Sequence, residues 1–438
     1  MLVTLQNAFK IKDIRNRIIY TFLMLVVVRI GSQLPIPGVD RTYFANWFAN
    51  QSGDAFNFFD AVTGGSFLQM SVFALNITPY ITSSIIMQLL TIAIPKLEEL
   101  QKDGDDGRKK IQKITRYLTV GLALMEASAM AVGFGKQGLL VDYNFVNVSM
   151  VIVTLTAGSA FLMWMGERIT EKGVGNGISI ILLVNIISRM PDDFISLFQQ
   201  FVATKTVAKG ALALVIILAV VIATVVFVVF LQGGERRIPV QYAKKMQGRK
   251  MVGGQSTHIP LKANTAGVIP IIFASSLMQF PVVITSLLGK NQGTGIGAKI
   301  LKALTSSHWF NLDEPVYSIG LLVYIVLVIF FAYFYTSITF NPIEVSNNMK
   351  KQGGFIPGIR PGKPTTDYLN KILNYVIFIG AVGLIIVATI PIFFSGVFGA
   401  SVSFGGTSLI IVVGVILETL KQVESQMIVR NYKGFLND

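Results

Sequence analysis

The side chains that most often catalyse reactions or hold metals are scarce in this sequence. Cysteine is absent, so disulfides and thiolate chemistry are excluded. The two histidines, His258 and His308, lie outside the long apolar runs and leave little for a zinc or iron site to use. We therefore expect no metal, no other cofactor and no enzyme activity.

Several glycine-rich segments invite comparison with nucleotide-binding loops, but their sequences do not fit. The phosphate-binding motif GxxxxGK[ST] does not occur, and its nearest approach, residues 361–364, has proline where serine or threonine is needed. The segments 173–177 (GVGNG) and 293–297 (GTGIG) lack the strand–turn–helix context of a dinucleotide site. We interpret both as turns, and any ATP-driven work must be done by a partner.

Two ionisable residues, Arg29 and Glu126, fall inside apolar runs, where ion-coupled transporters place their proton and ion sites. Two isolated groups do not make a proton relay. A bond from Arg29 to carbonyls near the membrane surface, and a protonated or paired Glu126, explain them equally well. An inverted-repeat secondary transporter is the alternative function, but it would need a midplane site. A polyprenyl-lipid transferase would need clustered carboxylates or histidines, whereas the loops here are basic.

The elements that must position these residues are membrane spans. The chain is 52% hydrophobic and only 14% charged, and residues 211–231 and 319–340 contain no charge at all. Each of these runs exceeds the roughly 20 residues that a helix needs to cross a bilayer. We predict an all-α integral membrane protein with ten spans, at about residues 18–35, 72–94, 116–134, 148–166, 177–190, 211–231, 265–288, 317–340, 369–392 and 405–423.

The lysines and arginines orient these spans. Of the 37 in the chain, 28 lie in the N-terminal segment, the C-terminal tail and the alternate loops on the same side, and eight lie on the opposite side. The positive-inside rule then places both termini in the cytoplasm. The ten spans divide at the loop 191–210 into halves of five, residues 1–190 and 211–438. An odd number per half gives the two halves opposite orientations, as in inverted repeats.

Three loops differ from ordinary connections. The external segment 36–71 is rich in phenylalanine, which favours a re-entrant element packed among the spans. The cytoplasmic loops 232–262 and 341–371 are long, basic and rich in glycine and proline. These two loops are either topology signals or a docking surface for an acidic partner or ribosomal RNA.

The second and seventh spans each contain a short group of polar residues. In lipid, such groups face a partner helix or water. They are either ordinary contacts between helices or part of a seam between helices that can separate. The residues are Ser83, Ser84, Gln88, Ser275, Ser276 and Gln279.

Five long stretches resemble the bacterial SecY family in sequence and in order: residues 76–90, 166–180, 255–276, 340–363 and 404–413. The resemblance covers essentially the whole chain. It implies a protein-conducting channel of the bacterial plasma membrane, with two pseudo-symmetric five-helix halves around a central pore. Unfolded secretory polypeptides with signal peptides would be its substrates, and apolar segments would leave sideways into the lipid bilayer through a lateral gate between the second and seventh spans.

The resemblance also assigns residues. The pore ring falls on Ile77, Ile81, Ile178, Leu182, Ile272 and Ile411, with Leu182 in place of a more familiar isoleucine. The plug falls at about residues 53–66, and the members we expect to matter are Asp54, Phe56, Phe58, Phe59, Asp60, Val62 and Thr63. Glu126 stands where the family pattern leads us to expect an uncharged polar residue.

The expected partners follow from the same resemblance. SecE would brace the back of the channel, usually with SecG beside it, and the motor ATPase SecA or a ribosome would dock on the two cytoplasmic loops. Arg360 matches a functionally sensitive loop arginine of the family. We expect the docking residues to be Lys244, Lys245, Arg249, Lys250, Arg360 and Lys363.

Overall fold

The computed structural model describes residues 9–43, 60, 63–203, 207–242, 245–247, 250–252, 256–287, 296–305, 309–310, 315–398 and 406–434. The N-terminal half contains α2 (Lys12–Gly31), α5 (Thr78–Ala93), α6 (Pro95–Lys102), α7 (Gly104–Phe134), α8 (Phe145–Lys172) and α9 (Gly177–Phe198). The C-terminal half contains α10 (Val207–Gly233), α11 (Ile269–Leu287), α12 (Ile296–Leu304), α13 (Ile319–Thr339), α14 (Pro342–Lys351), α15 (Lys363–Phe398) and α16 (Gly406–Gly434).

Each of the ten predicted spans overlaps one of these helices: α2, α5, α7, α8, α9, α10, α11, α13, α15 and α16. By length and composition, five helices of the described chain qualify as membrane spans, or six if α5 and α6 form one bent span. The others carry charges, as α9 does at Arg189, or have a shorter apolar stretch, as α11 does. The two-half helical architecture is confirmed.

The outward faces of these helices are apolar, as a lipid environment requires. On α10, side chains such as Val215 and Phe230 are 64% and 75% exposed. Leu23 of α2 and Val153 of α8 are exposed in the same way. Because a water-soluble protein buries such a surface, this apolar belt identifies the part of the molecule that lies in hydrocarbon.

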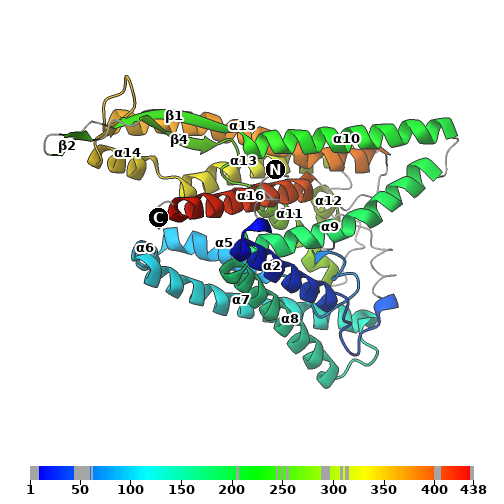
Figure 1. Cartoon of the computed structure of the whole chain (residues 1–438). Helices are drawn as coiled ribbons and strands as arrows, with labels where there is room; N and C mark the ends of the chain where they lie inside the picture. The colour runs from blue at the N-terminus through cyan, green and yellow to red at the C-terminus, as the bar shows by residue number, and fades with distance from the viewer. Residues whose placement is uncertain are drawn as a thin grey trace.

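Each half packs mainly within itself, and in the described part of the chain the halves meet at several places. Within the N-terminal half, α7 packs on α5 and α8, and α2 packs on α8 and α9; within the C-terminal half, α13 packs on α11 and α15. The halves contact each other where α9 meets α16 and where α7 meets α11. In Figure 1, α2, α7 and α8 lie on one side of the molecule and α10, α13 and α15 on the other, with α16 between them.

The second span begins later than predicted. Residues 72–77 form turns rather than helix, and α5 begins at Thr78 with proline in its first turn. Proline has no N–H to donate and its φ suits a first helical turn, so Pro79 favours a start at this point. Just before it, Asn76 has a positive φ of 51°, a conformation that asparagine tolerates better than most residues.

The two long basic loops, 232–262 and 341–371, join in one small sheet that the prediction of an all-α fold did not include. The first loop forms β1 (Glu235–Tyr242), which pairs antiparallel with β4 (Ser256–Lys262), and the second adds β5 (Gly354–Phe355) to the other edge of β1. A further hairpin, β2 (Lys245–Gln247) with β3 (Lys250–Val252), forms the tip. Ile238 and Val240 of β1 point to the same face and are buried against Met349 of α14 and Leu369 of α15.

Candidate gate, plug and docking surface

Three of the six predicted ring residues lie in one apolar cluster. Ile77 is fully buried at the start of α5, and Ile81, one turn further along, donates its backbone N–H to the Ile77 carbonyl at 3.0 Å. Ile178, in the first turn of α9, packs in the same cluster. The structure therefore brings the first ends of α5 and α9 together through branched aliphatic side chains.

The GVGNG segment, which we interpreted as a turn, fixes the position of Ile178. Asn176 is the N-cap of α9, and its side chain accepts hydrogen bonds from the backbone N–H groups of Ile178 and Ser179 at 3.1 and 3.4 Å. Gly177 packs directly against α8, because a Cβ at this position would lie only 2.1 Å from the Gly166 carbonyl oxygen. The glycines thus allow α9 to begin in contact with α8.

The other three ring residues lie on α9, α16 and α11. Leu182, one turn after Ile178, is 9% exposed. Ile411 of α16 is 5% exposed and packs with Ile180 and Ile186 of α9. Ile272 is half-buried on α11. Closure of all six into a single ring stays a prediction.

The polar residues of the predicted seam are engaged mainly within their own halves. Ser83 is buried and its hydroxyl donates to the Pro79 carbonyl of the same helix at 2.7 Å. Ser275 of α11 hydrogen-bonds Tyr324 of α13, which is also in the C-terminal half. Ser84 is half-buried, Gln88 and Ser276 are exposed, and Gln279 lies on α11.

Of the predicted plug residues, the structure describes Asp60 and Thr63. Asp54, Phe56, Phe58, Phe59 and Val62 lie outside the described residues. Asp60 is buried and its Oδ1 accepts a hydrogen bond from the backbone N–H of Leu68 at 3.0 Å. Thr63 is buried too, and its hydroxyl donates to the Asp60 carbonyl at 3.2 Å.

The charge count treats Arg189 only as one of the external positive charges. In the structure, this residue pairs with a residue of the plug. Arg189, in the middle of α9, forms an ion pair with Asp60, with Nη2 and Oδ2 2.7 Å apart. Arg29 of α2 donates from Nη1 to the carbonyl of Gly64 at 3.3 Å. The interpretation of Arg29 as a residue bonded to a carbonyl is thereby confirmed.

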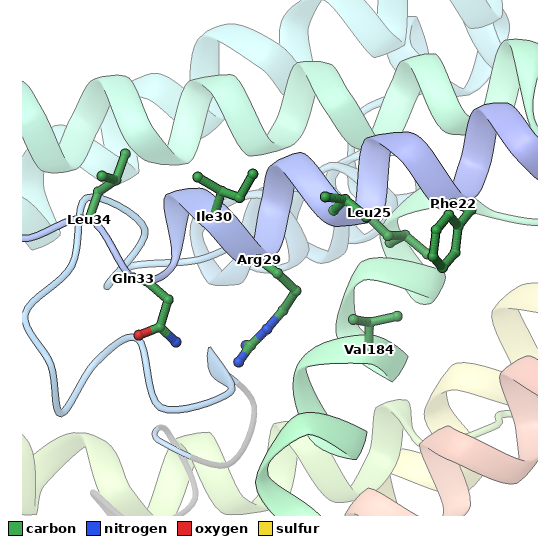
Figure 2. Close-up of a pocket in the computed structure, with 8 residues that line it drawn as sticks. Phe22, Leu25, Arg29, Ile30, Gln33, Leu34 and Val184 are labelled. Atoms are coloured by element: carbon green, nitrogen blue, oxygen red, sulfur yellow. The ribbon is translucent and has the colours of Figure 1, made fainter.

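A groove of about 690 Å³ runs between α2 and α9 (Figure 2). It is apolar over most of its length, with Arg29 and Gln33 toward one end. In Figure 2, Arg29 extends from α2 toward the loop below it, and Val184 lies opposite on α9. The lining residues are Phe22, Leu25, Val26, Arg29, Ile30, Gln33, Leu34 and Val184.

The predicted docking loops form one surface. Arg360 and Lys363 are exposed, and the turn that carries them is held by the Thr365 hydroxyl, which donates to the Arg360 carbonyl at 2.9 Å. Lys245 and Lys250 begin β2 and β3, which lie at the end of the long hairpin in Figure 1. Lys244 and Arg249 lie outside the described residues.

The base of this surface carries a local ion pair. Arg237 donates from Nε to Glu235 at 2.7 Å, and this hydrogen bond lowers the pKa of the Glu235 carboxyl. Within the described residues, no group of three or more His, Cys, Asp and Glu side chains is placed to hold a metal ion.

Comparisons with known proteins agree on one family. The family model SecY matches residues 71–420. Three proteins described as "Protein translocase subunit SecY" are similar over 98–100% of this chain and 99–100% of their own length. They are 42% identical in Corynebacterium glutamicum, 43% in Halalkalibacterium halodurans and 44% in Streptomyces scabiei.

Solved structures share the fold. One described as "The structure of a protein conducting channel" has a TM-score of 0.63 and 18% identity, covering 95% of this chain and 93% of its own. Another, described as "Sec61 in the Canine ribosome-channel complex from the endoplasmic reticulum", has a TM-score of 0.61 and 16% identity over the same shares.

Proposed function

The chain belongs to the SecY family and forms a protein-conducting channel, and from this premise we propose how its described residues do the work. The channel closes by apolar contact rather than by a charged barrier. A narrow apolar constriction loses its water, and this dewetting raises a high free-energy barrier to ions. No charged group is needed to block them. An unfolded polypeptide finds few persistent partners on such a wall and can slide past it.

The observation that carries this proposal is the apolar contact between the first ends of α5 and α9. Ile77, Ile81 and Ile178 pack in one apolar cluster there. Leu182 follows on α9, and Ile272 and Ile411 bring two C-terminal helices to the same ring in our proposal. The plug closes the external side at rest.

We infer that the seam between α5/α7 and α11/α13 is the lateral gate. When a segment of a translocating chain reaches the seam, it can partition between the pore and the lipid. Each Leu or Ile favours lipid by about 0.3–0.6 kcal/mol, and a charge opposes it by about 2.5–3.5 kcal/mol. The seam thus sorts segments by hydrophobicity, without a binding site for any one sequence.

A secondary transporter is not favoured. It would need a midplane substrate or ion site, and Arg29, one of its two candidate residues, is engaged with the Gly64 carbonyl. The apolar belt and the basic cytoplasmic loops fit a channel of the bacterial plasma membrane with both termini inside.

For the companion subunits, we propose that a helix of SecE lies in the groove between α2 and α9, with SecG elsewhere on the channel. Phe22 and Ile30 at the groove are 65% and 58% exposed, an apolar surface that a single-span helix would cover. Val26→Gln in the groove should reduce the amount of SecE that copurifies in mild detergent. Val153→Gln, on the exposed face of α8, is the matched control and should leave copurification unchanged.

SecA or a ribosome would dock on the cytoplasmic surface of β2, β3 and the Arg360 turn. Arginine presents a planar fork of donors that lysine cannot copy. Arg360→Glu should nearly abolish ATP-driven translocation, and Arg360→Lys should already weaken it. Lys363→Glu, three residues away and exposed, controls for simple loss of charge.

The experiment that tests the channel function is direct. The purified channel with its companion subunits is placed in vesicles, and protease protection measures the entry of an unfolded precursor driven by the motor ATPase. Entry that requires the channel and an intact signal peptide is the expected result. Uptake of a small solute without any precursor entry would support the transporter instead.

A further inference from the structure

The C-terminal part of the predicted plug is held against two helices by charged side chains. Asp60 pairs with Arg189 of α9 at 2.7 Å, and the Asp60 side chain is 1% exposed while that of Arg189 is 24% exposed. From the other direction, Arg29 of α2 reaches the Gly64 carbonyl at 3.3 Å. Two arginines from helices far apart in the sequence therefore hold the same short segment.

Two glycines let this segment turn directly against α9. Gly64 and Gly65 have φ values of 67° and 84°, the left-handed region that glycine adopts without strain. A Cβ at Gly64 would lie 2.8 Å from the Asn185 carbonyl oxygen, and one at Gly65 would lie 3.4 Å from Cδ of Arg189. The turn is thus pressed onto the same face of α9 that carries Arg189.

Asp60 is also tied to the chain that leads into α5. Its Oδ1 accepts from the Leu68 N–H at 3.0 Å, and its carbonyl accepts from the Gly65 N–H at 3.0 Å. Its remaining carboxylate oxygen faces Arg189. One buried carboxylate therefore connects the end of the plug to both α9 and the start of the second span.

We propose that Arg189 and Arg29 are positioning residues of the plug. With Asp60 and Gly64 they form a latch that keeps the plug closed at rest and sets how strong a signal peptide must be to open the channel. This inference rests on the proposed function. Removing one member of a buried ion pair leaves the other charge unpaired, so the closed plug is destabilised.

The test uses the complete channel in vesicles with four variants. Arg189→Gln and Asp60→Asn should each raise the resting ion leak, and the entry of a precursor with a defective signal, about tenfold, equivalent to about 1.4 kcal/mol in the closed–open equilibrium. Arg189→Lys keeps the charge and should leak less than Arg189→Gln. The double variant Asp60→Asn/Arg189→Gln should be no worse than either single variant, because both remove the same contact.

The matched control is Asp192→Asn, which also removes a carboxylate next to Arg189. Its side chain is 67% exposed and lies 3.9 Å from Arg189, so wild-type leak and stringency are expected. Wild-type behaviour of both single variants, additive effects in the double variant, or equal leak for Arg189→Lys and Arg189→Gln would each overturn the latch. Failure of the wild-type channel to admit an intact precursor would refute the channel function instead, so the two failures are distinguishable.

Discussion

Two of the junctions between the halves, α9 with α16 and α7 with α11, are built differently. At the junction of α9 with α16, Ile180, Ile186, Ile411, Val412 and Val415 are each at most 9% exposed and pack together across the boundary. At the junction of α7 with α11, the neighbouring serines bond inside their own halves, Ser83 to Pro79 and Ser275 to Tyr324. The first junction would lose buried apolar contacts on separating.

Separating the junction of α7 with α11 should cost less free energy. A polar group already bonded within its own half leaves no partner unsatisfied when the halves move apart, whereas a hydrogen bond across the boundary would have to be broken in lipid. We therefore predict that the molecule opens at the α7–α11 side and keeps its α9–α16 side closed.

The largest effect is expected from locking the seam. Cysteines at Ser84 and Ser276 are easily introduced because the chain has none. A short crosslink between them should block export of a signal-bearing precursor almost completely, and a long flexible crosslinker should spare it. As the mirror experiment, an oxidant-induced bond between cysteines at Ile186 and Val412 should leave export intact. Full export with the short seam crosslink would contradict the comparison.

The next largest effect is expected from placing a polar residue in the apolar junction of α9 with α16. Ile411→Asn loses about 1.5–3 kcal/mol of side-chain burial and buries an amide that costs about 1–3 kcal/mol if unsatisfied. We expect higher ion conductance of the resting channel and more entry of precursors with defective signals. Conductance measured in planar bilayers at equal channel content provides the readout. An unchanged resting conductance would remove Ile411 from the closed constriction.

A cavity at the junction of α9 with α16 should have a somewhat smaller effect than a buried polar residue. Ile186 is 1% exposed, so Ile186→Ala should destabilise the purified channel by about 2–5 kcal/mol. Ser84→Ala at the seam should change stability by a few tenths of a kcal/mol at most. Thermal aggregation in detergent compares the two. Equal midpoints for both variants would show that the junctions do not differ in packing.

The smallest effect is expected from removing the hydroxyl group of Tyr324 beside Ser275. Tyr324→Phe removes the partner of Ser275, a change worth about 0.5–1.5 kcal/mol. Ser275 is then free to bond toward α7, so opening should become slightly harder. A two- to tenfold slower insertion of a marginally apolar segment would support this. Faster insertion would show that the Tyr324 contact itself holds the gate closed.

The sequence predicted the spans better than it predicted the contacts between them. Apolar runs such as residues 211–231 and 319–340 specify helices through their own composition, and α10 and α13 lie where expected. The pairing of β1 with β5 could not be predicted, because it joins Gln241 to Phe355 across the intervening helices α11, α12, α13 and α14. Local patterns carry no information on such a register.

The latch was missed for a related reason. Arg189 is one of eight external basic residues, and charge counting treats them all alike. Its signal was its position near the end of a short span, four residues before Asp193, in a segment where helix continues through polar residues to Phe198. Asp60 was named within the plug, but its partner depends on how the loop folds back onto α9.

The small sheet of β4, β1 and β5 connects several elements of the C-terminal half. Strands β1 and β4 continue from α10 and lead into α11, and β5 lies between α14 and α15, so four elements of one half share a single stiff arm. A force applied to this three-stranded sheet would therefore act on several elements of the C-terminal half at once rather than on one loop. A partner that pushed on the sheet would do mechanical work on that half without entering the membrane.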